Sequence, residues 1–344
     1  MPVTFTPDDL TRLQDTLDEV VADGATPGGV IVCGTLDGPR EVLTSGLIAP
    51  ELGNVAPAEN TTYDVASLTK VLATWPLVGQ TLEAGLLDLE APVRDVLPVM
   101  SGETPSGDAT VRQLITHTAG LRASTRLDYY RGADAPLHEL LCREPLEDAP
   151  GSHRYINRGY ILLGLALAFV HGQPLDVLAA EFWQGLGMTS TSYGPVGRRA
   201  SVAPTEQRLP GAPRIWGTAH DENAALMGGV AGHAGVFSTP ADLAAYAHGL
   251  LSSYSQGNGF LGEWLRASLV PHATIEPGLD RGLSWILASG GGVAYHHGWT
   301  GTSVYLAPEA GRYLVVVTNA VYYGTSRTRI APLRAAALKT ISAT

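Results

Sequence analysis

The stretch Tyr63-Asp-Val-Ala-Ser67-Leu-Thr-Lys70 places a lysine three residues after a serine. The chain contains only two lysines among its 22 basic residues, and the other 20 are arginines. Arginine stays protonated at any useful pH, whereas a desolvated lysine can lose its proton and act as a base. A lysine kept at Lys70 therefore indicates a site whose amine must titrate.

Positions i and i+3 share one face of a helix, so the Lys70 amine is expected to lie within reach of the Ser67 hydroxyl. A serine with a base at this distance is the arrangement that activates a nucleophile. The Ser-x-x-Lys spacing alone is also compatible with an exposed turn of helix that has no catalytic role. More distant parts of the chain must therefore decide between these two interpretations.

Composition excludes several classes of partner. The chain has 344 residues, of which 45% are hydrophobic and 16% charged, and its net charge is −11. It can bury a large core in one or two domains. An acidic chain of this kind would not attract nucleic acid or an anionic membrane, so neither is expected as a partner. Two cysteines, Cys33 and Cys142, do not make a disulfide framework, and Cys33 is expected in the core.

The start of the chain, Met1-Pro-Val-Thr-Phe-Thr-Pro-Asp-Asp-Leu10, has no basic segment followed by an apolar one. We therefore expect a cytoplasmic protein, or a periplasmic one if a leader has been removed. No run of about 18 uninterrupted apolar residues occurs, so no transmembrane helix is expected. The most apolar run, Ile161 to Val170, is typical of a buried core helix.

The order of the predicted elements suggests an insertion. A helix capped by Thr6 begins at Pro7, and two strands follow at Gly29–Gly34 and Glu41–Leu47. Helix resumes near Ser67 and runs towards residues 84–85, where Pro76 must either kink it or lie near its start. The pattern then stays mainly helical, interrupted by long loops, to about residue 225.

Strands and helices return at the far end of the chain. Ser238-Thr-Pro-Ala-Asp242 begins a helix, Tyr313–Thr318 is typical of a central strand, and a closing helix spans roughly 327–341. We predict one α/β domain built from residues 1–66 and 226–344. Residues 67–225 form the inserted, mainly helical region, and a site at the seam would draw residues from distant parts of the sequence.

Four more motifs are expected near that seam. One is Tyr155-Ile-Asn157, in a loop before the apolar helix, and a second is the short helical stretch Leu114–Leu121 around His117. The third runs from His220-Asp-Glu-Asn-Ala224 into Gly228–Thr239. The fourth, Tyr295-His-His-Gly-Trp-Thr-Gly-Thr-Ser303, leads directly into a strand.

Together these motifs resemble the serine β-lactamase and penicillin-binding protein superfamily over essentially the whole chain. The pattern is most similar to the class C-like branch, which also holds family VIII carboxylesterases, D,D-peptidases and proteins like penicillin-binding protein 4B. Ser67-Leu-Thr-Lys70 resembles the first family motif and Tyr155-Ile-Asn157 the second, while His296-His297-Gly298 stands where the family has Lys-Thr-Gly. The resemblance implies a central antiparallel sheet flanked by helices, with no cofactor.

The resemblance also implies a set of roles. Ser67 would form an acyl-enzyme, with Lys70 and Tyr155 sharing one proton network, so that neither alone is assigned as the base. Tyr155 would later protonate the leaving group, and Asn157 would orient Lys70 and bind substrate. The backbone N–H groups of Ser67 and Trp299 would form the oxyanion hole. His296, His297, Gly298 and Trp299 would bind substrate along the strand edge.

Two groups of residues have simpler interpretations. His117 is expected to be a structural histidine with its hydrogen bonds satisfied. His220, Asp221, Glu222 and His233 do not match any zinc spacing, so no metal site is predicted, and we expect them to support the wall of the site through hydrogen bonds.

The third motif departs from the family pattern at His296, where β-lactamases carry a lysine that attracts substrate carboxylates. Histidine is mostly neutral at pH 7 without an acidic partner, and Trp299 adds an apolar wall. We therefore expect a serine hydrolase acting on esters or small amides, with weak or no β-lactamase activity. A D,D-peptidase or β-lactamase is the first alternative, and a non-catalytic ligand sensor or scaffold is the second.

Overall fold

A computed structural model describes residues 4–99, 102–257, 259–288, 292–324 and 327–343. Its main feature is an eight-stranded sheet in the order β2-β1-β11-β10-β9-β8-β7-β6, in which every neighbouring pair is antiparallel. The strands are β1 Gly28–Thr35, β2 Glu41–Gly46, β6 Ala273–Glu276, β7 Leu279–Arg281, β8 Ile286–Ala288, β9 Val293–His297, β10 Ser303–Ala307 and β11 Arg312–Thr318. The sheet therefore combines strands from both ends of the chain, as the layout predicts.

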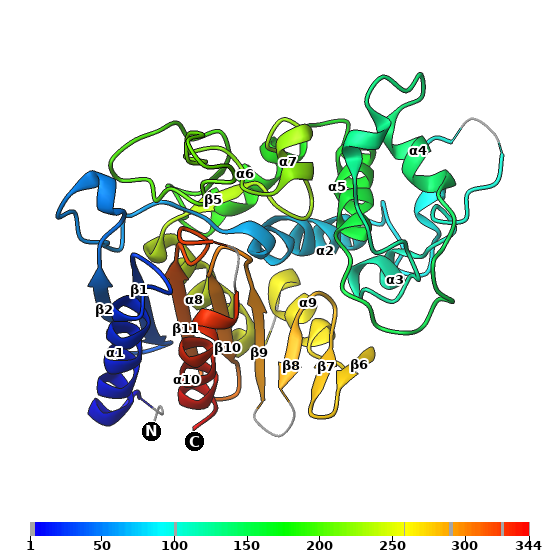
Figure 1. Cartoon of the computed structure of the whole chain (residues 1–344). Helices are drawn as coiled ribbons and strands as arrows, with labels where there is room; N and C mark the ends of the chain where they lie inside the picture. The colour runs from blue at the N-terminus through cyan, green and yellow to red at the C-terminus, as the bar shows by residue number, and fades with distance from the viewer. Residues whose placement is uncertain (1–3, 100–101, 258, 289–291, 325–326, 344) are drawn as a thin grey trace.

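Strands β1 and β11 lie between two hydrophobic cores, because both are buried over their whole length. Alternate residues of a strand face opposite sides of the sheet. Ile31 and Val316 face the core formed with α1 Pro7–Ala22 and α10 Ala331–Ser342, whereas Val30 and Val315 face the larger core on the other side. Figure 1 shows α1 and α10 side by side over one face of the sheet, with both chain ends beside them.

The two predicted N-terminal caps are confirmed. Thr6 and Asp9 form a capping box at the start of α1, and Pro7 is the first helical residue. Helix α8, Pro240–Gln256, begins in the same way after Thr239, whose side chain accepts a hydrogen bond from the Asp242 N–H. Helix α8 packs on β1, β10 and β11, opposite α1 and α10, and contacts α9 Phe260–Ser268.

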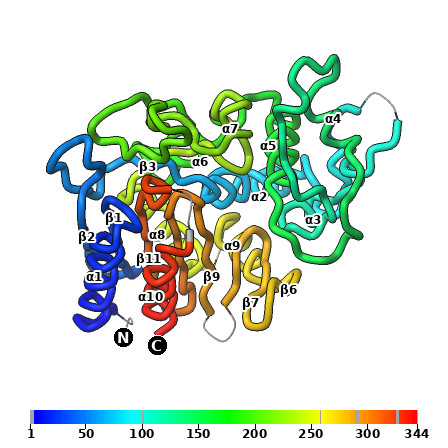
Figure 2. Tube along the Cα trace, in the orientation of Figure 1, coloured from blue at the N-terminus to red at the C-terminus, as the bar shows by residue number. Residues whose placement is uncertain are grey.

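The middle of the chain is mainly helical and lies beside the sheet, along the top and right of Figures 1 and 2. Its helices are α2 Trp75–Glu83, α3 Val111–Ile115, α4 Leu137–Arg143, α5 Asn157–His171, α6 Leu175–Gly185 and α7 Glu222–Leu226. Helix α5 is the predicted core helix, with Ile161, Leu162 and Leu163 buried. The predicted division at residues 66 and 226 stays a prediction.

No helix in the described part of the chain is, taken singly, long and apolar enough to span a membrane. Helices α5 and α6 meet that length and composition only as a pair bent by 86°.

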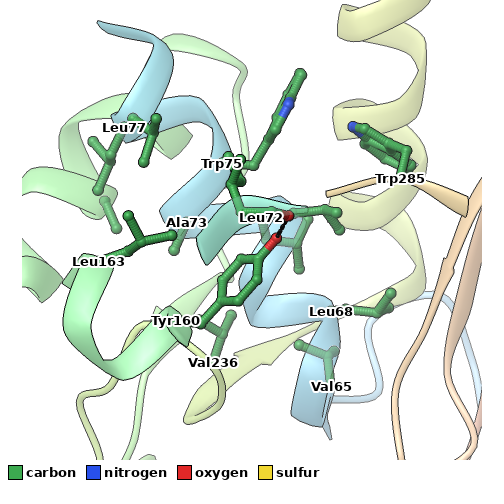
Figure 3. Packing of buried hydrophobic residues seen from close by; sticks show 14 of the residues in the cluster. Val65, Leu68, Leu72, Ala73, Trp75, Leu77, Tyr160, Leu163, Val236 and Trp285 are labelled. Atoms are coloured by element: carbon green, nitrogen blue, oxygen red, sulfur yellow. Dashed lines mark hydrogen bonds between the residues drawn. The ribbon is translucent and has the colours of Figure 1, made fainter. Parts of the chain in front are cut away.

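The segment after Ser67 is helical, but it is not the continuous α-helix that the sequence suggests. A 3₁₀ turn at Ala66–Leu68 leads into a π-helical stretch at Lys70–Thr74, and α2 follows from Trp75. Pro76 has no N–H to donate to Leu72, whose carbonyl accepts from the Trp183 indole at 2.8 Å instead. Figure 3 shows this segment packed against Tyr160 and Leu163 of α5.

Candidate active site

Ser67 lies in a tight turn that leaves the small sheet formed by β3 Tyr63–Asp64, β5 Val236–Ser238 and β4 Ser192–Tyr193. Pairing of β3 with β5 is extended by a bond from the Val65 N–H to the Val236 carbonyl at 3.0 Å. Ala66 has φ +46°, a strained value for a residue with a side chain. The buried Asp64 carboxylate accepts the Ala66 N–H at 2.8 Å and so holds the turn that presents Ser67.

Lys70 is completely buried directly below Ser67. Its Nζ donates to Ser67 Oγ at 3.0 Å, to Asn157 Oδ1 at 2.9 Å and to the His233 carbonyl at 3.3 Å. These three bonds use all three N–H groups of an ammonium. The predicted contact between Ser67 and Lys70 is therefore present, and Asn157 holds Lys70 in place.

Tyr155 and Asn157, at the start of α5, both lie close to the Lys70 amine. Asn157 is the first residue of that helix, and Tyr155 lies in the loop before it. The Lys70 Nζ lies 4.8 Å from the centre of the Tyr155 ring. Tyr155 remains 43% exposed, so its ring is open to an incoming molecule.

The turn between β9 and β10 is fixed against the Ser67 turn. Thr300 Oγ1 donates to the Asp64 carbonyl at 2.6 Å, and Thr302 Oγ1 donates to the Val65 carbonyl at 3.1 Å. A Cβ atom on Gly298 would lie 2.3 Å from the Val65 carbonyl oxygen, so only glycine permits this approach. Trp299, 39% exposed, is thus carried next to the Ser67 turn.

His296 is buried and His297 is half-buried at the end of β9. The His297 carbonyl can only accept, so His296 donates to it through Nδ1 at 3.1 Å and keeps an unprotonated Nε2. Burial, with Arg281 and Lys70 nearby, holds the pKa of His296 well below its ordinary value. His296 is therefore neutral, as the sequence suggests, and His297 Nδ1 pairs with Ser303 Oγ at 2.8 Å.

A cavity of about 780 Å³ joins these elements. Its lining contains every predicted site residue except Lys70, which lies beneath Ser67. These lining residues are Ser67, Tyr155, Asn157, His296, His297, Gly298 and Trp299. Residues more than 200 positions apart in the sequence thus share one wall. A cavity of this size accommodates a small ester or the end of a peptide.

A further part of the cavity lining, which includes His220, Asp221 and Glu222, is held by hydrogen bonds and ion pairs. His233 Nε2 donates to Asp221 Oδ1 at 2.8 Å, His220 Nε2 pairs with Glu206 at 3.0 Å, and Glu222 pairs with Arg208 at 3.2 Å. Burial alone would raise the pKa of Asp221, but His233 and the Ala224 N–H together lower it below its ordinary value. Among the described residues no group of three or more histidine, cysteine or acidic side chains is arranged to hold a metal.

Sequence reasoning missed Arg281, the last residue of β7. Its side chain is buried, lines the cavity, and lies 5.9 Å from the centre of the Tyr155 ring. It donates from Nε to His153 Nε2 at 3.2 Å and from Nη1 to the Ser284 carbonyl at 2.8 Å. Nothing in the sequence distinguishes it from the other 19 arginines, because its position depends on the register of the short strand β7 between β6 and β8.

The family model described as "Beta-lactamase" matches residues 13–339 of this chain. The chain belongs to the beta-lactamase family. It is a serine hydrolase. The family implies small-molecule substrates, namely esters, peptides or β-lactams. The resemblance and the fold predicted from the motifs are both confirmed.

The names of individual relatives refer to different activities. The chain is 30% identical to a protein of Escherichia coli (strain K12) named "Putative D-alanyl-D-alanine carboxypeptidase", with 77% of this chain and 70% of that protein covered. Among solved structures it resembles a class C beta-lactamase from Rhodobacter sphaeroides (TM-score 0.76, 19% identity, 96% and 98% covered). It is also similar to EstCE1, a hydrolase with promiscuous acyltransferase activity (TM-score 0.74, 21% identity, 96% and 98% covered). At these identities the two structures show the fold alone.

Proposed function

We propose that this enzyme hydrolyses acyl donors whose leaving group carries a carboxylate, as the leaving group of a carboxypeptidase substrate does, through an acyl intermediate on Ser67. The observation that carries the proposal is the buried guanidinium of Arg281 in the cavity wall. Within the described parts of the chain, no carboxylate lies within ion-pair distance of it.

A buried charge without a counter-charge is costly, so Arg281 is a place where an incoming anion would be favoured. Its Nε and Nη1 are committed to His153 and Ser284, whereas no hydrogen bond from Nη2 to a described residue is present. Burial and Arg281 itself lower the pKa of His153 to about 4, so His153 remains a neutral acceptor at pH 7. His153 therefore supplies no counter-charge to the guanidinium, which can bind a carboxylate in a charge-assisted geometry.

The chemistry follows from the contacts around Ser67. Its Oγ attacks the scissile carbonyl, and its proton passes to the network of Lys70 and Tyr155. The tetrahedral oxyanion is held by the N–H groups of Ser67 and Trp299. When the carbon–heteroatom bond breaks, Tyr155 returns a proton to the leaving alkoxide or amine. Water then attacks acyl-Ser67 by the same proton route in reverse and releases the acid.

His296 is not the only residue that sets the charge of this cavity wall, because Arg281 lines it as well. A neutral His296 on β9 removes the positive charge that a lysine would supply at that position, and Arg281 supplies a positive charge from β7, two strands away in the same sheet. The relatives named D-alanyl-D-alanine carboxypeptidases support a substrate with a terminal carboxylate. A second candidate is hydrolysis of neutral esters, which the exposed Trp299 ring favours because it offers an apolar wall.

A matched pair of donors separates these candidates. One is an acyl-D-alanyl-D-lactate depsipeptide, and the other is its D-lactamide, which differs only in the loss of the carboxylate charge. A charge-assisted bond contributes about 1.5–3 kcal/mol, so kcat/KM should favour the lactate by roughly 10- to 100-fold. Arg281→Gln should remove that preference and leave the lactamide rate nearly unchanged. Equal rates on both donors with the wild-type enzyme would instead support the neutral-ester function.

A further inference from the structure

We propose that His117 is a positioning residue that holds Tyr155 in its reactive place. The inference rests on the proposed role of Tyr155 in proton transfer, and it gives His117 a function beyond that of a structural histidine. No motif spacing indicates it, because His117 lies 38 positions before Tyr155 in the sequence.

His117 binds the backbone on both sides of Tyr155. Its carbonyl accepts the Arg154 N–H at 2.8 Å, and its Nδ1 accepts the Ile156 N–H at 3.2 Å. The residues before and after Tyr155 are thus tied to one histidine, one through its main chain and one through its ring. A further bond from the Gly151 N–H to the Thr118 carbonyl, 2.8 Å long, extends this pairing.

The ring of His117 also lies between two tyrosines. Its centre is 4.4 Å from that of Tyr155 and 5.0 Å from that of Tyr160, with tilts of 37° and 31°. Tyr160 is itself fixed, because its hydroxyl donates to the Ile115 carbonyl at 2.8 Å and pairs with Ser284 Oγ at 2.7 Å. Tyr155 therefore rests against rigidly held aromatic rings, although the residue as a whole is only partly buried.

Packing alone does not explain a histidine at this position. Because Nδ1 accepts a hydrogen bond, the proton of the neutral ring is on Nε2, and that atom is buried without a partner among the described residues. A buried N–H without a partner destabilises the fold, and the feature that offsets it is Nδ1, the acceptor that the Ile156 N–H would lose if an apolar ring stood here. Burial, with Arg281 and Lys70 nearby, holds the pKa of His117 well below its ordinary value, which keeps Nδ1 free to accept.

The backbone at His117 allows an informative pair of variants. Its φ is +60°, a conformation that asparagine and glycine adopt more readily than other residues. The amide oxygen of His117→Asn can take the place of Nδ1 and accept the Ile156 N–H. His117→Gly fits the same backbone and removes the acceptor. The two variants therefore differ mainly in the bond that holds Tyr155.

The test measures kcat and KM per active site, with active sites counted by the amount of acyl adduct formed. A displacement of about 1 Å at a reacting group can cost on the order of 100-fold in rate. His117→Gly should thus lose about 100-fold in kcat with KM within roughly 3-fold, whereas His117→Asn should stay within about 10-fold of the wild type. If His117 were merely structural, both substitutions would lower the active fraction and the melting temperature, and the kcat of the remaining active enzyme would not differ between the asparagine and glycine variants.

Two comparisons keep the outcome decisive. Tyr155→Phe is measured in parallel: if it keeps full activity, the proposed role of Tyr155 is wrong, and if it loses activity while both His117 variants keep theirs, only the present inference is overturned. Equal losses for asparagine and glycine overturn it as well. His171→Asn, at a histidine of α5 that bonds Thr81 away from the cavity, is the control and should keep wild-type kcat. If His117→Gly does not fold, His117→Gln replaces it, because its amide reaches towards Nε2 rather than Nδ1.

Discussion

Replacing Gly298 by alanine should displace the oxyanion-binding turn without touching any catalytic side chain. The added Cβ would lie 2.3 Å from the Val65 carbonyl oxygen, whereas real contacts of this kind are rarely below 3.4 Å, so about 1 Å of movement is required. Thr302 Oγ1, at 2.1 Å from the new atom, can rotate away, but the Val65 main chain cannot. The turn carrying the Trp299 N–H must therefore move away from Ser67.

The expected cost follows from the loss of one oxyanion donor, which is about 3 kcal/mol or roughly 100- to 1,000-fold in kcat. Overpacking should also destabilise the fold by about 1–3 kcal/mol. The assay is steady-state hydrolysis of the D-lactate depsipeptide, with urea unfolding to measure stability. Gly185→Ala is the matched control. Gly185 lies in α6, and apart from its chain neighbours and the backbone of its own helix no described atom comes within 4 Å of the place its new methyl group would take, so activity should not change. A folded Gly298→Ala enzyme with kcat within 3-fold of the wild type would refute the assignment of Trp299.

Three further outcomes are expected. Lys70→Arg should lower kcat by at least about 1,000-fold, because the buried site must then hold a larger cation that cannot give up its proton; more than a tenth of wild-type kcat would contradict this. Asp221 has a lowered pKa in the fold, so it stabilises the protein above about pH 4 and this stability is lost as the pH falls further. The fall of the urea midpoint between about pH 4 and 2 should therefore be shallower in Asp221→Asn than in the wild type, and an equal fall in both would exclude its pairing with His233. Arg158→Leu removes the buried partner of Glu144 and leaves it the longer ion pair with Arg122, at 3.7 Å, and the Tyr130 hydroxyl, so urea unfolding should show a loss of about 1–3 kcal/mol; an unchanged stability would show that the Arg158 pair contributes nothing.

Much of the fold follows from local patterns in the sequence. The caps at Thr6 and Thr239 and the buried run of β11 are set by neighbouring residues, so the sequence predicts them. The contact of Ser67 with Lys70 is likewise local, since it spans one turn. The π-helical stretch was missed because it depends on long-range bonds, such as the one from Trp183 to the Leu72 carbonyl.

The site residues that belong to short sequence motifs were predictable, whereas those placed by tertiary packing were not. Tyr155, Asn157 and the turn at Gly298 lie in short signatures, and the structure brings them together around one cavity. Arg281 and His117 have no such signature. Their positions depend on long-range contacts: the Ser284 N–H donates to the Ile115 carbonyl, and Tyr160 of α5 donates to the same carbonyl. Neither the periodicity nor the motif spacing of the sequence reveals such contacts.

The most direct test is whether Ser67 carries the acyl group. The wild-type enzyme and Ser67→Ala are mixed with the D-lactate depsipeptide, quenched within milliseconds, and digested with trypsin for mass spectrometry of the peptide spanning residues 41–70. The wild-type peptide should gain the mass of the acyl group, and the Ser67→Ala peptide should not. An unmodified wild-type peptide during steady turnover, or hydrolysis by Ser67→Ala at the wild-type rate, would contradict an acyl-serine mechanism at this site.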